Sequence, residues 1–265
     1  MRAVFSRRRG VGTACALGIL AMCLLTGGAQ ALPAVGDLFS SGPMPYPLPA
    51  SPPYVIALDA GHGGSDTGAH SSQLEEVEAC ERAVDALYAR LAKDDRFTPV
   101  RTRENGEGCR IKERAARAAE AKANVLLSIH FNSDPSCAQS HGFECFPTPP
   151  GRDWSENSLV LARCIAARMG GAGHRLRGAD GVRFAYYSGK RKLIVDATDT
   201  RERTLQSFGI LESAMSPAVL VEQGFLSNSS DRAAWTGQEG CKKAAEAYYL
   251  ALCDYFGMEP QPAQS

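Results

Sequence analysis

The sequence predicts an α/β fold in which helices cover both faces of a largely parallel, mixed sheet, giving three α-β-α layers. Two observations predict it. Short apolar runs of strand length alternate with longer segments whose apolar residues recur every three or four positions. Strands that alternate with helices in this way favour a parallel sheet. The 265 residues, 44% of them hydrophobic and 22% charged, exclude wholesale disorder and suit one domain.

Three strongly apolar runs predict buried strands at Tyr54–Asp59, Asn124–Asn132 and Pro217–Phe225. Thr98–Arg103 is expected to be a further strand. Gly142–Phe146 is a candidate to pair beside the strand at 124–132.

Five segments are expected to be helical: Leu74–Leu91, Arg110–Ala123, Ser155–Met169, Asp231–Trp235 and Glu239–Phe256. In the first of these, five apolar residues recur at helical spacing and line one face, which should pack on the sheet. They are Val77, Cys80, Val84, Leu87 and Leu91.

Residues 1–31 have the pattern of a secretory signal peptide, with a basic start, an apolar run over Val11–Leu25 and small residues up to Ala31. Cleavage after Ala31 is expected, and an uncleaved anchor or a lipid on Cys23 is the alternative. The run is shorter than the roughly 20 residues of a membrane span, so no membrane attachment is expected after cleavage. The chain should then work in a periplasm or at an extracellular cell wall.

Cleavage would remove four arginines and no acid, which leaves 29 − 4 = 25 basic and 29 acidic residues, a formal charge of −4. A basic footprint for nucleic acid is therefore excluded. A Pro-rich linker is expected over residues 32–53, a catalytic domain over 54–257 and a polar tail over 258–265. Cys137 and Cys145 are the pair most expected to form a disulfide, and no cysteine spacing suggests a thiolate zinc site.

Three polar side chains, His62, His130 and Glu222, follow or end the three apolar strands. In parallel α/β sheets ligands bind at the carboxyl ends of the strands. Two histidines and a carboxylate suit a catalytic Zn²⁺, which takes three protein ligands and a water. Taken singly, the residues also allow simpler interpretations: a turn histidine, a satisfied core histidine and a buried partner for a basic group.

A second carboxylate is needed to move protons. The helix at 74–91 opens with Glu75, Glu76 and Glu78, and Glu76 lies closest to its apolar stripe. Glu76 is therefore expected to be the third metal ligand, with Glu75 as the alternative, and Glu222 remains as the acid/base group.

Three motifs carry a family resemblance: Leu58–Ala69, Ser128–Ser133 and Val221–Asn228. Together they resemble the motifs of the zinc-dependent N-acetylmuramoyl-L-alanine amidases of type 3, in the same order. The resemblance covers about Val55–Phe256. It implies a phosphorylase/hydrolase-like α-β-α fold with one Zn²⁺ per chain.

The resemblance also implies roles for individual residues. His62, Glu76 and His130 would bind the zinc, Glu222 would be the catalytic glutamate, and Asn132 would hydrogen-bond the substrate or cap the turn after its strand. At the second ligand this chain reads Glu76-Val-Glu-Ala-Cys-Glu81, where the family usually has Glu-Lys-Asp-x-Asn-Leu. The implied reaction cleaves the amide between the lactyl group of N-acetylmuramic acid and the L-alanine of the peptidoglycan stem peptide.

Two other functions stay open: a carboxypeptidase-like zinc amide hydrolase, and a non-catalytic peptidoglycan-binding regulator on the same fold. No wall-binding repeat is visible, so affinity for peptidoglycan would come from the groove itself or from a partner such as an activator protein. Arg177–Thr200 is longer than the family's usual connection and could turn a hairpin at Ser188-Gly189. That segment would line the groove, gate the zinc as a lid, or be a neutral surface excursion.

Overall fold

The computed structural model describes residues 51–71 and 73–262. The expected signal peptide, its cleavage site, Cys23 and the linker up to residue 50 lie outside the described residues. Within the described part of the chain, no helix combines the length and apolarity that a bilayer crossing requires.

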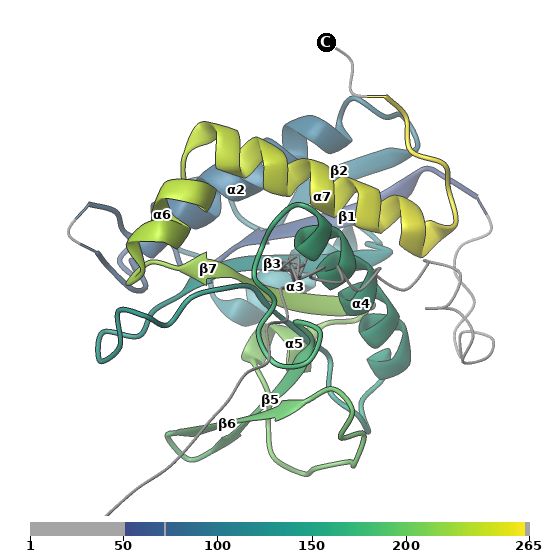
Figure 1. Ribbon diagram of the computed structural model, residues 1–265. Helices are drawn as coiled ribbons and strands as arrows, with labels where there is room; N and C mark the ends of the chain where they lie inside the picture. Colours follow the sequence, from purple (N-terminus) through teal and green to yellow (C-terminus); the bar gives the residue numbers. More distant parts are fainter. Residues whose placement is uncertain (1–50, 72, 263–265) are drawn as a thin grey trace, which may run out of the picture. The chain divides into compact units, whose positions relative to one another are not determined.

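A five-stranded sheet in the order β2-β1-β3-β7-β4 forms the centre (Figure 1). Its strands are β1 (Tyr54–Ala60), β2 (Phe97–Arg101), β3 (Val125–Asn132), β4 (Glu144–Pro147) and β7 (Ala218–Phe225). The first three strands and β7 are parallel, and β4 runs antiparallel to β7. This mixed, mostly parallel sheet with flanking helices confirms the predicted fold class.

The placement predicted for Gly142–Phe146 is wrong. β4 pairs with β7 and not with the strand at 124–132, because β7 occupies that side of β3. A strand that is buried along its whole length, as β7 is, belongs in the interior of a sheet that is covered on both faces. The short β4 takes the edge.

Helices α2 (Glu76–Leu91), α4 (Ser155–Gly171) and α7 (Gln238–Phe256) pack with one face of the sheet in the main hydrophobic core. Helices α3 (Ile111–Glu120) and α5 (Gly209–Ser213) pack on the other face. The short helix α6 (Ser229–Trp235) contacts β7 and α7. Helix α5 was not expected from the sequence, because five residues are too few to show a helical period.

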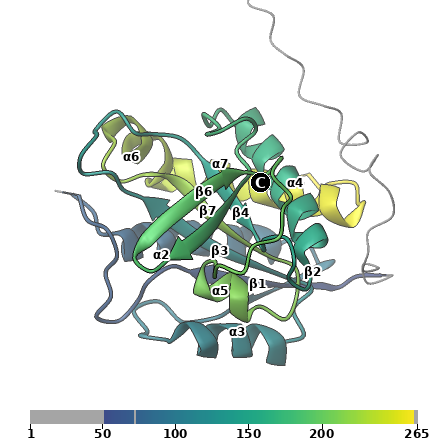
Figure 2. The ribbon, with the colours of Figure 1, turned by 90° about the horizontal axis from the view of Figure 1, so that it is seen from below.

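The segment 177–200 contains a hairpin, as its turn signal predicted. Strand β5 (Arg183–Ser188) pairs antiparallel with β6 (Arg191–Asp196) around Gly189, whose φ is +60°. The hairpin lies on the same side of the sheet as α5, seen best from below (Figure 2). It joins the smaller core of that face through Ala185 and Ile194.

Side-chain alternation along the strands separates the core from the polar residues. In β7, Val219 and Val221 point into the main core, whereas Leu220 joins the smaller core with Leu126 of β3. Because successive side chains point to opposite faces, Glu222 points to the side of Leu220. The Glu222 carboxylate thereby lies on the face of the sheet that α3 and α5 cover.

The expected disulfide between Cys137 and Cys145 is also wrong. All seven cysteines among the described residues are free thiols. Cys145 is fully buried in β4, within the main core, whereas Cys137 lies in the preceding loop and is only half-buried. Cys145 therefore acts as a small apolar core residue.

His174, which follows α4, is buried against Trp235, with ring centroids 3.3 Å apart. Neither ring nitrogen has a hydrogen-bond partner among the described residues. Burial, together with the positive charge of Lys243, lowers the pKa of His174 from 6.5 to about 3. The folded protein therefore holds this histidine neutral where the unfolded chain takes up a proton.

Stability should consequently fall with acidification. Below pH 6.5 the unfolded state binds a proton at His174, whereas the folded state keeps the ring neutral. The free energy of unfolding therefore falls by about 1.4 kcal/mol per pH unit. Between pH 6.5 and pH 4 the wild type should lose roughly 3 kcal/mol more than His174→Phe. Urea denaturation at both pH values measures this, and equal losses would contradict it.

Candidate metal centre

His62 lies in the turn after β1, at a backbone φ of +61°, between Gly61 and Gly63. Gly61 and a second glycine of the same motif, Gly68, are needed for the close approach of the site's side chains. A Cβ on Gly61 would lie 2.4 Å from the ring of His130, and one on Gly68 would lie 2.6 Å from that of His62. The glycines of the first motif thus allow the two imidazoles to come together.

A carboxylate, that of Asp66, fixes the orientation of the His62 ring. Its Nδ1 lies 3.0 Å from Oδ2 of Asp66, which leaves Nε2 to face Glu76. A carboxylate behind one ring nitrogen is the usual way to orient a metal-binding histidine. Asp66 is therefore a supporting residue of the turn and not part of the group that converges on the metal position.

Glu76 is the first residue of α2 and is buried. Its Oε1 lies 2.9 Å from Nε2 of His62 and 3.1 Å from Nδ1 of His130. The backbone N–H groups of Ala69 and Phe131 also donate to this carboxylate. Glu75 is exposed, so the structure brings Glu76 and not the alternative to the histidines.

Each member of this group offers one ligand atom, and the ligand atoms lie within 4.8 Å of one another. Although burial alone would lower the pKa of His62, hydrogen bonds to Glu76 and Asp66 raise it to about 9. Although burial would raise the pKa of Glu76, hydrogen bonds from His130 and His62 lower it well below its usual range. The three groups thus favour a positive charge between them, and two nitrogens with one carboxylate fit the donor set of a catalytic zinc.

Glu222 stands opposite His130 in the register of β7 and β3. Its side chain is buried, and its Oε2 has no hydrogen-bond partner among the described residues. Burial raises the pKa of Glu222 to about 7; the charge of Glu76 adds to this, and those of His130 and Lys192 oppose it. A carboxylate with this pKa can accept and return a proton near neutral pH.

A cavity of about 320 Å³ opens over the histidines on the α3/α5 side of the sheet. Its lining includes Asp66, His62 and His130, together with Phe208 and Ile210 at the start of α5. The cavity joins polar groups on one wall to apolar ones on the other, as expected of a small ligand-binding cleft.

A buried polar network, two members of which line the cavity, connects the strand ends. Asp59 accepts hydrogen bonds from Thr102 (2.5 Å) and Ser128 (2.6 Å) and pairs with Arg114 at 3.2 Å. Arg114 also donates to the carbonyl oxygen of His62. Asp59 therefore positions the turn that carries His62 and is not among the converging groups.

At the end of β3, Asn132 donates from Nδ2 to Oε2 of Glu144 (2.9 Å), and its Oδ1 accepts from the backbone of Ser133. Glu144 is buried in β4 directly opposite Glu222, and Arg183 of the hairpin donates to its Oε1 at 2.5 Å. Sequence reasoning missed Glu144 and Arg183, because the edge position of β4 was not predicted.

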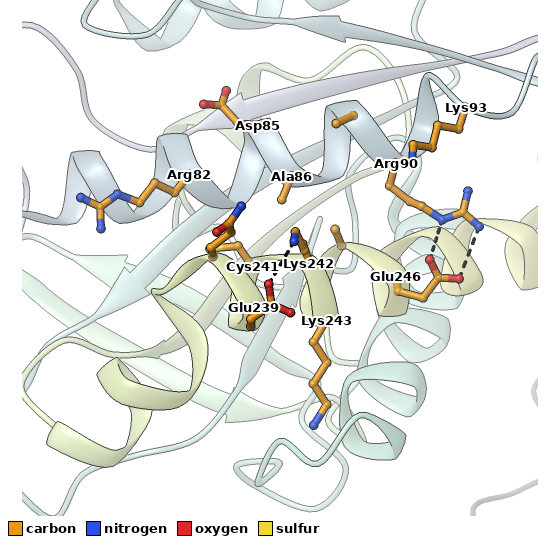
Figure 3. A pocket seen from close by; sticks show the side chains of 13 residues that line it. Arg82, Asp85, Ala86, Arg90, Lys93, Glu239, Cys241, Lys242, Lys243 and Glu246 are labelled. Atoms are coloured by element: carbon orange, nitrogen blue, oxygen red, sulfur yellow. Dashed lines mark hydrogen bonds and ion pairs between the residues drawn. The ribbon is translucent and has the colours of Figure 1, made fainter. Parts of the chain in front are cut away.

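A larger cavity, of about 970 Å³, lies between α2 and α7 on the other side of the sheet (Figure 3). Charged side chains line it, and Arg90 reaches across to Glu246, with Nε and Oε2 2.5 Å apart. None of the residues that line it belongs to the metal-binding group found among the described residues. The candidate metal centre therefore belongs to the smaller cleft, which His62 and His130 line.

The model of one protein family, described as N-acetylmuramoyl-L-alanine amidase, matches residues 56–254, which include all the site residues above. The chain belongs to this family. Among curated amidases, it is 31% identical over 227 residues to the probable N-acetylmuramoyl-L-alanine amidase AmiB of Haemophilus influenzae. That match covers 76% of this chain and 51% of AmiB, so the chain spans about half the length of this relative.

The chain is also similar to the uncharacterized protein YqiI of Bacillus subtilis, at 28% identity over 204 residues, covering 76% of this chain and 84% of YqiI. Among solved structures, it resembles the amidase of Clostridium difficile 630 with a TM-score of 0.64 at 22% identity. That superposition covers 78% of this chain and 98% of the amidase. At this identity the likeness shows the amidase fold, including its mostly parallel sheet.

Proposed function

We propose that this protein is a zinc-dependent N-acetylmuramoyl-L-alanine amidase with one Zn²⁺ per chain, held by His62, Glu76 and His130. The observation that carries the proposal is the convergence of these three side chains on one point, with a buried carboxylate, Glu222, on the adjacent strand. The substrate is the amide between the lactyl group of N-acetylmuramic acid and the L-alanine of the stem peptide.

When bound, zinc would polarise the scissile carbonyl and acidify a water molecule. Glu222 accepts the proton of the attacking water and then donates it to the nitrogen of the leaving L-alanine. Its pKa of about 7 suits both transfers, since one group must be a base and then an acid. Phe208 and Ile210 supply apolar side chains to the lining of the cleft.

The remaining parts of the proposal concern the surroundings of the enzyme. Peptidoglycan is the proposed partner, and the chain would meet it after export, in a periplasm or at an extracellular wall. Asn132, at the rim of β3, is proposed to contact the substrate while Glu144 holds its amide in place. An activator protein is a further proposed partner, because the sequence carries no wall-binding repeat.

The test uses the purified chain from Leu32 onward and a synthetic N-acetylmuramyl tripeptide, with products identified by mass. The expected products are N-acetylmuramic acid and a tripeptide with a free L-alanine amine. A chelator should abolish their formation and added zinc should restore it. A peptide shortened from its carboxyl end would instead show a carboxypeptidase, and binding without cleavage in the zinc-loaded protein would show a regulator.

A further inference from the structure

Lys192 belongs to the hairpin and stands opposite Tyr187 in the register of β5 and β6. Its Nζ lies 4.6 Å from the ring centroid of Phe208 and 5.3 Å from that of Phe146. Phe208 is part of the wall of the catalytic cleft, and Phe146 lies in β4 beside β7. Two aromatic faces therefore hold an ammonium group at the rim of the cleft.

The neighbouring cations already have carboxylate partners. Arg114 pairs with Asp59, and Arg183 pairs with Glu144. Lys192, in contrast, forms no ion pair within 4.0 Å with any carboxylate among the described residues. The ammonium group therefore lies beside Phe208 of the cleft wall without a carboxylate partner of its own among the described residues.

We propose that Lys192 is a substrate-binding residue that pairs with a carboxylate of the stem peptide. The inference deepens the proposed function and rests on it. The stem peptide carries such groups close to the scissile bond: its D-glutamate is linked through the side-chain carboxyl, so the α-carboxylate is free. The carboxylate at the carboxyl terminus of the peptide could pair with an ammonium group in the same way, but it lies further from the scissile bond. A charge-assisted hydrogen bond in this partly buried position is stronger than a neutral one.

Three N-acetylmuramyl-L-alanyl-γ-D-glutamyl-L-lysine substrates separate these sources. One has both carboxylates free, one is amidated at the D-glutamate α-carboxyl, and one is amidated at the carboxyl terminus. Lys192→Gln should raise KM for the free substrate about tenfold, with kcat little changed, the size expected when a hydrogen bond to a charged group is lost. Lys192→Arg should retain most of the affinity, because guanidinium also pairs with carboxylates.

The amidated substrate that lacks the bound carboxylate should be cleaved equally by the wild type and Lys192→Gln, and it thereby identifies which carboxylate Lys192 binds. Lys190→Gln, an exposed neighbour in the same hairpin, should change no constant and serves as the matched control. The inference is overturned if Lys192→Gln loses the same factor on all three substrates, or if the loss falls on kcat and not on KM, because Lys192 would then act through Glu222 or the fold. If the zinc-loaded wild type cleaves none of the three, the proposed function fails and the inference fails with it.

Discussion

Replacing Glu222 by glutamine should lower kcat by a factor of roughly 10² to 10⁴, the range typical of losing a general acid/base. The amide has nearly the same volume as the carboxylate but takes no proton from water. Because Glu222 does not belong to the converging group of His62, Glu76 and His130, the bound zinc should stay near one per chain. Turnover of the synthetic substrate and metal analysis on the same sample measure both effects.

Thermal unfolding of Glu222→Gln controls for damage to the fold. The buried carboxylate has an unpartnered Oε2, so its neutral replacement should leave the unfolding temperature unchanged or slightly higher. A variant that keeps more than a tenth of the wild-type kcat would show that another group carries the proton.

Replacing Glu76 by alanine should weaken zinc binding by more than about 100-fold, beyond what the loss of an outer-shell partner costs. The carboxylate is the member of the converging group that contacts both histidines, so its removal also takes away the partner of the His130 ring, while Asp66 still orients His62. Activity should fall in parallel and return only in part with excess zinc. Metal analysis after dialysis and a zinc titration of the activity measure this.

Glu75→Ala is the matched control, since it removes the adjacent, exposed carboxylate from the same chain segment. It should bind zinc as tightly as the wild type. If Glu75→Ala loses the metal and Glu76→Ala keeps it, the ligand assignment moves by one residue and the geometry described above does not represent the metal-bound protein.

The fold was largely predictable because the apolar periods are strong. Strands β1, β3 and β7 are nearly continuous apolar runs, and α2 carries its stripe of Cys80, Val84 and Leu87 into the core. What the sequence does not encode locally is the order of the strands. The position of β4 depends on β7, which lies about 70 residues further along the chain, and no local pattern of Gly142–Phe146 reports it.

The residues of the site likewise divide into those that a local sequence pattern predicts and those that depend on contacts distant in sequence. His62 was predictable because it follows an apolar strand, Glu222 because it is a carboxylate inside one, and Glu76 because it borders the apolar face of a helix. Glu144 and Lys192 were not, since both reach the cleft only through the edge pairing of β4 and the docking of the hairpin. The expectation that Asn132 contacts the substrate remains a prediction.

The most direct test of the central claim is a digest of purified peptidoglycan by the chain from Leu32 onward, with Glu222→Gln in parallel and zinc measured in both. The account predicts zinc near one per chain in both proteins, and stem peptides with a free L-alanine amine from the wild type alone. The absence of zinc from the wild type would contradict the assignment of His62, Glu76 and His130. Release of the same peptides by Glu222→Gln at the wild-type rate would contradict the role of Glu222.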